Sequence, residues 1–90
     1  MPFFVVERNY DQEVTVPIDS APDINLINDE EDVRWLYSFL SLDHRKSYCL
    51  YEAPSIEAIL AAAARAGMPA DSVVEITGRV MPSGHLVPVT

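Results

Sequence analysis

Hydrophobic and polar residues form six short blocks along this 90-residue chain, and their patterns predict an α+β fold. Segments rich in aromatic and β-branched residues predict strands, whereas apolar residues at helical spacing behind capping signals predict helices. The predicted strands cover residues 3–8, 33–41, 45–53 and 73–77, and the helices cover about 20–27 and 55–67. This order predicts a ferredoxin-like βαββαβ sandwich: an antiparallel four-stranded sheet, in the order 4-1-3-2, with two helices on one face.

The helix ends carry specific signals. Ser55 is a suitable cap for the second helix, and Gly67 is expected to end it in a left-handed conformation. The first helix is expected to begin at Ser20, with Pro22 in its first turn. Acidic residues fill positions 29–32, where they oppose the helix dipole. The helix should therefore fray there, unless a bound cation offsets the repulsion.

The two middle strands are predicted to form a hairpin with Asp43 and His44 as a two-residue loop. In that register Ser38 faces Cys49 and Leu36 faces Tyr51. The other face would then carry large apolar side chains from both strands, namely Trp35, Tyr37, Phe39, Tyr48 and Leu50. Two helices can cover only one face of the sheet, so we expect a second subunit to cover the other. The chain is thus predicted to be a homodimer.

The whole chain, residues 1–90, is predicted to be one ferredoxin-like domain with its core in residues 3–80. The tail, residues 81–90, resembles a turn followed by a short edge strand. That segment could extend the sheet or cross to a partner subunit.

Composition narrows the classes of partner. The net charge is −8 with only six basic residues, which disfavours binding to nucleic acid and favours cations or basic partners. No apolar run is long enough for a membrane helix, and a single cysteine cannot form an internal disulfide, so we expect a cytoplasmic protein. With three glycines and no phosphate-binding loop, no nucleotide cofactor is expected.

One string of residues resembles a known family. Its central part is Val33-Arg34-Trp35-Leu36-Tyr37-Ser38-Phe39, followed by Ser41, Asp43, Lys46, Cys49, Tyr51, Ala53 and Pro54. Val6-Glu7-Arg8 precedes this string, and Gly67-Met68-Pro69-Ala70-Asp71 follows it. Together they resemble the small bacterial nickel-binding-protein-like family over residues 3–77. The resemblance implies a ferredoxin-like dimer and, for some members, nickel ions bound at the surface.

A first candidate site lies on or near the central hairpin. Asp43, His44 and Glu52 offer an imidazole and two carboxylates, which suit nickel or another divalent transition metal. His85 in the tail is a further candidate ligand. The alternative is that Asp43 forms the turn and that both histidines are ordinary exposed residues. An imidazole binds metal only when neutral, so such a site should weaken below about pH 6.

A second candidate site is a polar cleft formed by Glu7, Ser38, Cys49 and Glu75. Ser38 and Cys49 should share one face, and the two glutamates lie on the neighbouring strands. Cys49 could serve there as a ligand or as a reactive thiol, although nearby carboxylates would raise its pKa. The alternative is that Cys49 is a small buried core residue.

Three functions remain open at this level. The preferred one is a small dimeric binding protein that takes up nickel or a similar metal for sequestration or buffering, and not an enzyme. The second is a small dimeric α/β-barrel enzyme, such as an isomerase or a cofactor-free oxygenase, by analogy of fold alone. The third is an interaction dimer with no small ligand.

Overall fold

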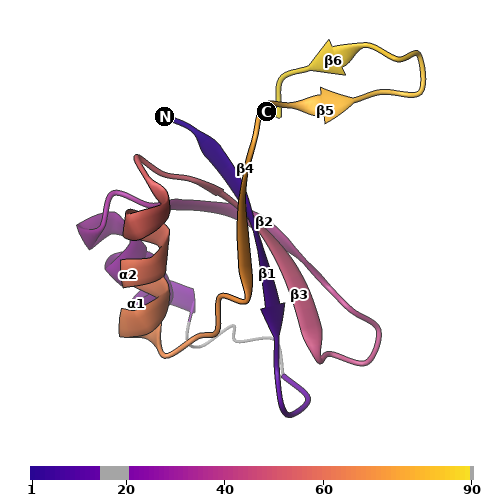
Figure 1. Ribbon diagram of the computed structural model, residues 1–90. Coiled ribbons are helices and arrows are strands. Elements are labelled where there is room, and N and C mark those ends of the chain that lie inside the picture. The colour runs from indigo at the N-terminus through magenta and orange to yellow at the C-terminus, as the bar shows by residue number, and fades with distance from the viewer. Residues whose placement is uncertain (15–20, 90) are drawn as a thin grey trace.

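The computed structural model describes residues 1–14 and 21–89, and it has the predicted order of elements (Figure 1). Strand β1 (Phe3–Asn9) leads to helix α1 (Ala21–Glu30), and strands β2 (Arg34–Leu40) and β3 (Lys46–Glu52) follow. Helix α2 (Ile56–Ala66) and strand β4 (Ser72–Ile76) complete the unit. The ferredoxin-like α+β fold is therefore confirmed. The cap predicted at Ser20 lies outside the described residues.

The four strands form one antiparallel sheet in the order β2-β3-β1-β4, which is the predicted order. Both helices lie on the same side of this sheet (Figure 1). Alternate residues of the central strands face the helices and form the core, with Phe4, Val6 and Tyr51 each at most 4% exposed. We call this the inner face of the sheet and the opposite one the outer face.

The observed hairpin differs from the predicted one by a β-bulge in β2. Ser38 faces Cys49 as predicted, but the register shifts between Trp35 and Tyr37, so that Trp35 faces Tyr51. The prediction that Leu36 faces Tyr51 and that Trp35 joins the outer face is therefore wrong. One extra residue in a bulge reverses the face of every residue beyond it. Trp35 packs against the inner core instead.

The caps of α2 are those expected from the sequence. The Ser55 hydroxyl accepts a hydrogen bond from the Ala58 N–H at 3.2 Å, and Gly67 adopts a left-handed conformation with φ of 68°. Because a side chain at this φ is strained, glycine is the residue that ends the helix most easily.

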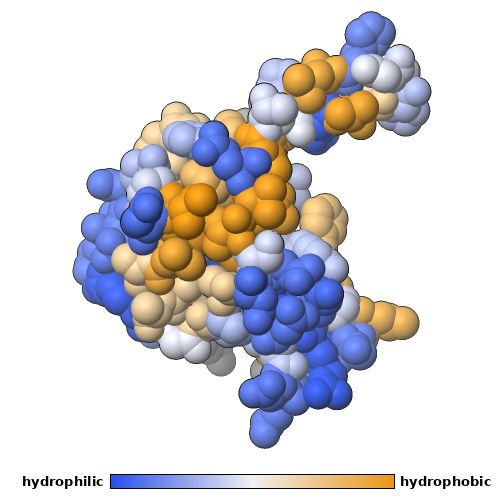
Figure 2. All heavy atoms as spheres, viewed as in Figure 1, coloured by the Kyte–Doolittle hydropathy of each residue, from blue (hydrophilic) through white to orange (hydrophobic). Residues whose placement is uncertain are grey.

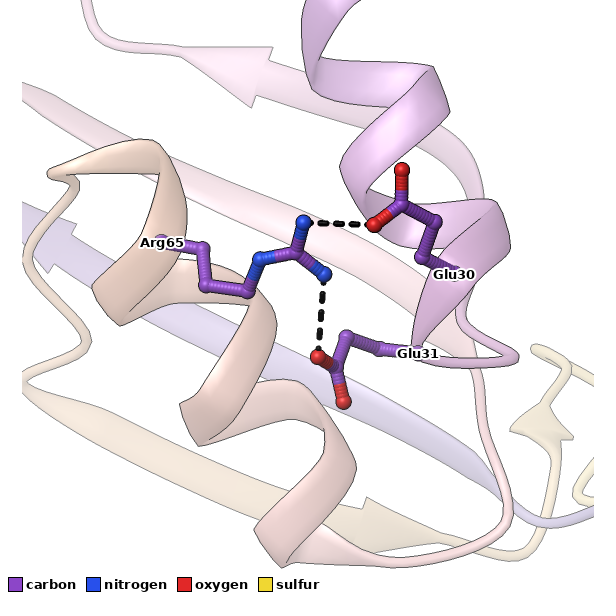
Figure 3. A network of polar contacts seen from close by, with 3 residues as sticks. All are labelled: Glu30, Glu31 and Arg65. Atoms are coloured by element: carbon purple, nitrogen blue, oxygen red, sulfur yellow. Dashed lines mark hydrogen bonds and ion pairs between the residues drawn. The ribbon is translucent and has the colours of Figure 1, made fainter.

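The acidic end of α1 meets a cation from α2. The Arg65 guanidinium donates to Glu30 Oε2 at 2.6 Å and to Glu31 Oε1 at 3.1 Å (Figure 3). The sequence suggested that this helix end would fray or would need a bound cation. The helix ends at Glu30, and a side chain of the same chain supplies the positive charge.

The C-terminal segment does not extend the four-stranded sheet. Among the described residues, strands β5 (Arg79–Val80) and β6 (Leu86–Val87) pair only with each other, and they form a separate hairpin that projects from the body beyond the end of β4 (Figure 1). Its apolar residues Val80 and Leu86 are exposed, and Figure 2 shows hydrophobic surface both on this hairpin and in the centre of the body. After the hairpin the chain turns back, and Val89 is buried. No helix in the described residues is long and apolar enough to cross a membrane.

Candidate functional site

The β2–β3 turn is held by Asp43. One carboxylate oxygen, Oδ1, accepts hydrogen bonds from the Ser41 hydroxyl at 2.7 Å and from the Arg45 N–H at 3.0 Å. These two bonds lower the pKa of Asp43, the Ser41 bond more strongly. The last backbone hydrogen bond between the β2 and β3 sides of the hairpin before the turn runs from the Ser41 N–H to the Lys46 carbonyl, at 2.8 Å. The loop is therefore longer than the two residues predicted. Asp43 is thus a turn former, and it is an ionised carboxylate at the surface.

His44 follows in the same turn with a positive φ of 60°. Its Nδ1 lies 3.1 Å from the Val14 carbonyl oxygen. A carbonyl can only accept, so Nδ1 must carry the proton, and in the neutral ring Nε2 keeps its lone pair. The Val14 N–H in turn donates to the His44 carbonyl at 2.8 Å. These two bonds fix the turn against the segment that follows β1.

The other two predicted metal ligands lie elsewhere. Glu52 is at the far end of β3, roughly 20 Å from Lys46 at about 3.3 Å per residue, and it pairs with Arg34 at 3.4 Å. His85 is in the turn between β5 and β6, where its Nδ1 lies 2.9 Å from the Ser83 hydroxyl. Asp43 and His44 are therefore neighbours, whereas Glu52 cannot share an ion with them. Within the described residues, no three His, Cys, Asp or Glu side chains gather in a group that could hold a metal ion.

The predicted polar cleft is brought together only in part. Ser38 and Cys49 face each other and line one cavity on the inner face. Glu7 lies on the outer face, opposite Tyr48, where its carboxylate is 3.5 Å from the Lys46 ammonium. Glu75 is in register with Phe4 on the exposed edge strand β4 and does not line the cavity. The prediction that all four residues share one pocket is therefore wrong, because the register sets Val6, not Glu7, opposite Cys49.

The cavity between the inner face and the helices has a volume of about 650 Å³. Its walls are mostly apolar and come from both helices and from β2 and β3; Ile27, Trp35 and Leu40 are examples. Two polar pairs lie on the strand side. The Trp35 indole N–H donates to the Ser38 hydroxyl at 2.9 Å, and the Tyr10 and Ser47 hydroxyls are 3.0 Å apart. The Cys49 thiol lies 3.7 Å from the Ser47 hydroxyl.

Arg8 is buried next to Tyr51, a residue of the cavity wall, and the sequence analysis did not include it in a site. Arg8 is 2% exposed, and its guanidinium donates to the Pro69 carbonyl and, at 3.0 Å, to the Tyr51 hydroxyl. Its Nε has no hydrogen-bond partner among the described residues. Strand alternation could have revealed it, because Phe4, Val6 and Arg8 are two residues apart and so share a face.

The outer face of the sheet remains largely open. Tyr37, Phe39 and Tyr48 are 47%, 66% and 41% exposed, and the Tyr37 and Phe39 rings meet edge to face at 5.5 Å. A smaller hollow of about 300 Å³ lies among these aromatic residues and Val89. Aromatic residues exposed side by side are typical of a surface that binds another protein.

Comparison with known proteins supports the resemblance seen in the sequence. A family model described as nickel responsive protein SCO4226-like matches residues 4–76. The crystal structure of SCO4226 from Streptomyces coelicolor A3(2) is similar to this chain with a TM-score of 0.65 and 24% identity. The alignment covers 82% of this chain and 94% of that one. The search of curated proteins found no match.

Proposed function

This chain belongs to the nickel responsive protein SCO4226-like family, and from that premise we propose that it is a small homodimeric binding protein that takes up a divalent transition metal, nickel first, for sequestration or buffering. The observation that carries the proposal is the orientation of His44. Its Nδ1–H donates to the Val14 carbonyl, which leaves Nε2 as a free lone pair in the neutral ring. Histidines that bind metals are usually held in this way, because the second hydrogen bond fixes both the tautomer and the ring.

Asp43 is the natural second ligand at this site. It is adjacent to His44 in the turn, and the lowered pKa of its carboxyl keeps it ionised at neutral pH. Only one of its oxygens is used to hold the turn, which leaves Oδ2 for an ion. One imidazole and one carboxylate suit nickel, with water completing the coordination. The chain's net charge of −8 adds a favourable field for a cation.

The homodimer rests on the outer face. Its aromatic residues stay exposed in the single chain, although the inner face of the same strands is covered by the helices. A second copy would bury Tyr37, Phe39 and Tyr48 against their equivalents, as in the self-complementary interface of a two-fold dimer. A chain of this size also gains from a partner, because its own core is small.

Titration calorimetry with nickel, zinc and cobalt tests the metal proposal. Nickel should bind in the micromolar range at about pH 7.5 and weakly at about pH 5.5, because a protonated imidazole cannot bind a metal. The variant His44→Ala should lose this site, and Asp43→Asn should weaken it. The matched control is His85→Ala, which removes an imidazole from the distant β5–β6 turn and should keep the site. No heat with any of the three metals, or unchanged binding in His44→Ala, would contradict the proposal.

A further inference from the structure

The inner-face cavity carries an inference that is independent of the metal proposal. Its volume of about 650 Å³ is in the usual range for small-molecule sites. Apolar side chains from four elements surround it, and the indole of Trp35, the only tryptophan, forms part of the wall. Such walls favour a flat apolar body, because each buried Å² of apolar surface contributes about 25 cal/mol.

Four polar side chains of the cavity lie on its strand side, and Asp23 of α1 and Arg65 of α2 also line it from the helix side. Ser38 and Cys49 are cross-strand neighbours, and Ser47 and Tyr51 are two residues before and after Cys49 on β3. These four side chains therefore lie together on the inner face of the sheet and all line the cavity. A few convergent polar groups on one wall of an apolar cavity are what fixes the orientation of a ligand.

Tyr51 differs from the other hydroxyls because a buried cation lies behind it. The Arg8 guanidinium donates to the Tyr51 oxygen at 3.0 Å, so the tyrosine accepts on that side. Burial raises the pKa of Tyr51 by more than Arg8 lowers it, which keeps the proton on the oxygen at neutral pH. That proton has no acceptor among the described residues. A hydroxyl that accepts from a cation is also a stronger donor, since hydrogen bonds in a chain polarise one another.

Arg8 makes the same wall electropositive. It is almost fully buried, and no carboxylate of the described residues forms an ion pair with it. Its positive charge is therefore stabilised by neutral groups, namely the Pro69 carbonyl, the Tyr51 hydroxyl and the face of the Tyr51 ring, whose centroid is 5.8 Å away. A ligand oxygen with negative partial or full charge would be stabilised beside Tyr51.

We propose that this cavity binds a small flat apolar molecule that carries one acceptor oxygen, a carbonyl or a carboxylate, to which the Tyr51 hydroxyl donates. The apolar body lies against Trp35, Ile27 and Leu40, and the oxygen lies at the strand wall. Arg8 does not touch the ligand and is a positioning residue that holds and polarises Tyr51.

The test uses three probes of matched shape: naphthyl methyl ketone, naphthoate and ethylnaphthalene. Binding is followed by the indole N–H resonance of Trp35 in a two-dimensional NMR titration of the full chain. The ketone and the carboxylate should shift this resonance and bind about tenfold more tightly than the hydrocarbon, the value of one good hydrogen bond. The tighter of the two oxygen-bearing probes identifies the acceptor as neutral or charged. In the variant Tyr51→Phe, the affinity of the ketone and the carboxylate should exceed that of the hydrocarbon by about twofold or less.

A filling variant keeps the proposal testable if Tyr51→Phe does not fold. Ala66 lines the cavity near the end of α2, so Ala66→Leu places side-chain volume in existing space and should abolish binding of all three probes. Ala64→Leu on the exposed side of the same helix is the matched control and should bind as the native chain does. No shift of Trp35 with any probe, equal affinity for all three, or binding that survives Ala66→Leu would overturn the proposal.

Discussion

The two faces of the sheet are made from the same strands, yet the aromatic side chains on them differ greatly in exposure. On the inner face Phe4 is 1% exposed, whereas on the outer face Phe39 is 66% exposed. Tyr51 and Tyr48 on β3 show the same contrast, at 4% and 41%. The difference lies in what covers each face. The helices and the core close the inner one, whereas among the described residues the C-terminal segment, at Arg79 and Val89, reaches the outer one.

This contrast separates two kinds of chemistry. The inner face combines the core with a buried arginine and a cavity, so its polar groups act in a medium of low dielectric. In such a medium a hydrogen bond is stronger, and a polar group without a partner destabilises the fold more. The outer face carries aromatic residues and the Glu7–Lys46 ion pair, both in contact with solvent. Stability should therefore depend on the inner face and association on the outer one.

The largest expected effect comes from exchanging one phenylalanine on each face for alanine. Phe4→Ala should lower the free energy of unfolding by about 3–5 kcal/mol, because it empties a fully buried site. Phe39→Ala should change the unfolding of the single chain by less than about 1 kcal/mol, because the ring is mostly exposed. Urea denaturation at low protein concentration measures both. Equal losses for the two variants would show that the faces do not differ as described.

A smaller effect is expected at the buried Arg8–Tyr51 pair. Tyr51→Phe removes the acceptor of the guanidinium and should cost about 1–3 kcal/mol. The pKa of Tyr51 is raised in the folded chain, so above the ordinary tyrosine value of about 10 the unfolded state loses its proton first. The free energy of unfolding should thus fall as the pH rises through and above about 10. Urea midpoints between about pH 8 and pH 11 should fall less steeply for Tyr51→Phe, and identical slopes would count against the role given to this pair.

The smallest effect is expected at the ion pairs between the two helices. Arg65→Ala removes two ion pairs to Glu30 and Glu31 (Figure 3), but these side chains are 28–60% exposed and solvent screens them. We expect a small fall in Tm at low salt that disappears at high salt. A fall that persists in high salt would mean that Arg65 stabilises the helices by packing instead.

The sequence predicted the elements and their order because each depends on local signals. Ser55 and Gly67 marked the ends of one helix, and aromatic and β-branched blocks marked the strands. The bulge after Trp35 was not predictable in this way, since an extra residue leaves no mark in an alternating apolar run. That one residue moved Trp35 from the expected outer face to the cavity wall.

For the candidate sites too, local features could be predicted from the sequence, whereas long-range ones could not. The pairing of Ser38 with Cys49 followed from the hairpin, which is a local feature. The position of Glu7 depended on the register between β1 and β3, which are far apart in sequence, and a shift of one residue decides its face. The sequence analysis gave Arg8 no place in a site, because arginine is seldom fully buried, although it shares a face with Phe4 and Val6; the structure shows it buried behind the cavity.

Native mass spectrometry of the full chain, with and without nickel, is the most direct measurement of the central claim that the outer face binds a second copy while the β2–β3 turn binds metal. We expect a dimer in both samples, bound nickel in the second, and a monomer that still binds nickel for Phe39→Asp. Leu42→Asp, a charge of the same kind on a fully exposed loop residue, should remain dimeric. A native chain that is monomeric and free of nickel at micromolar concentration would contradict both the outer-face dimer and the metal site.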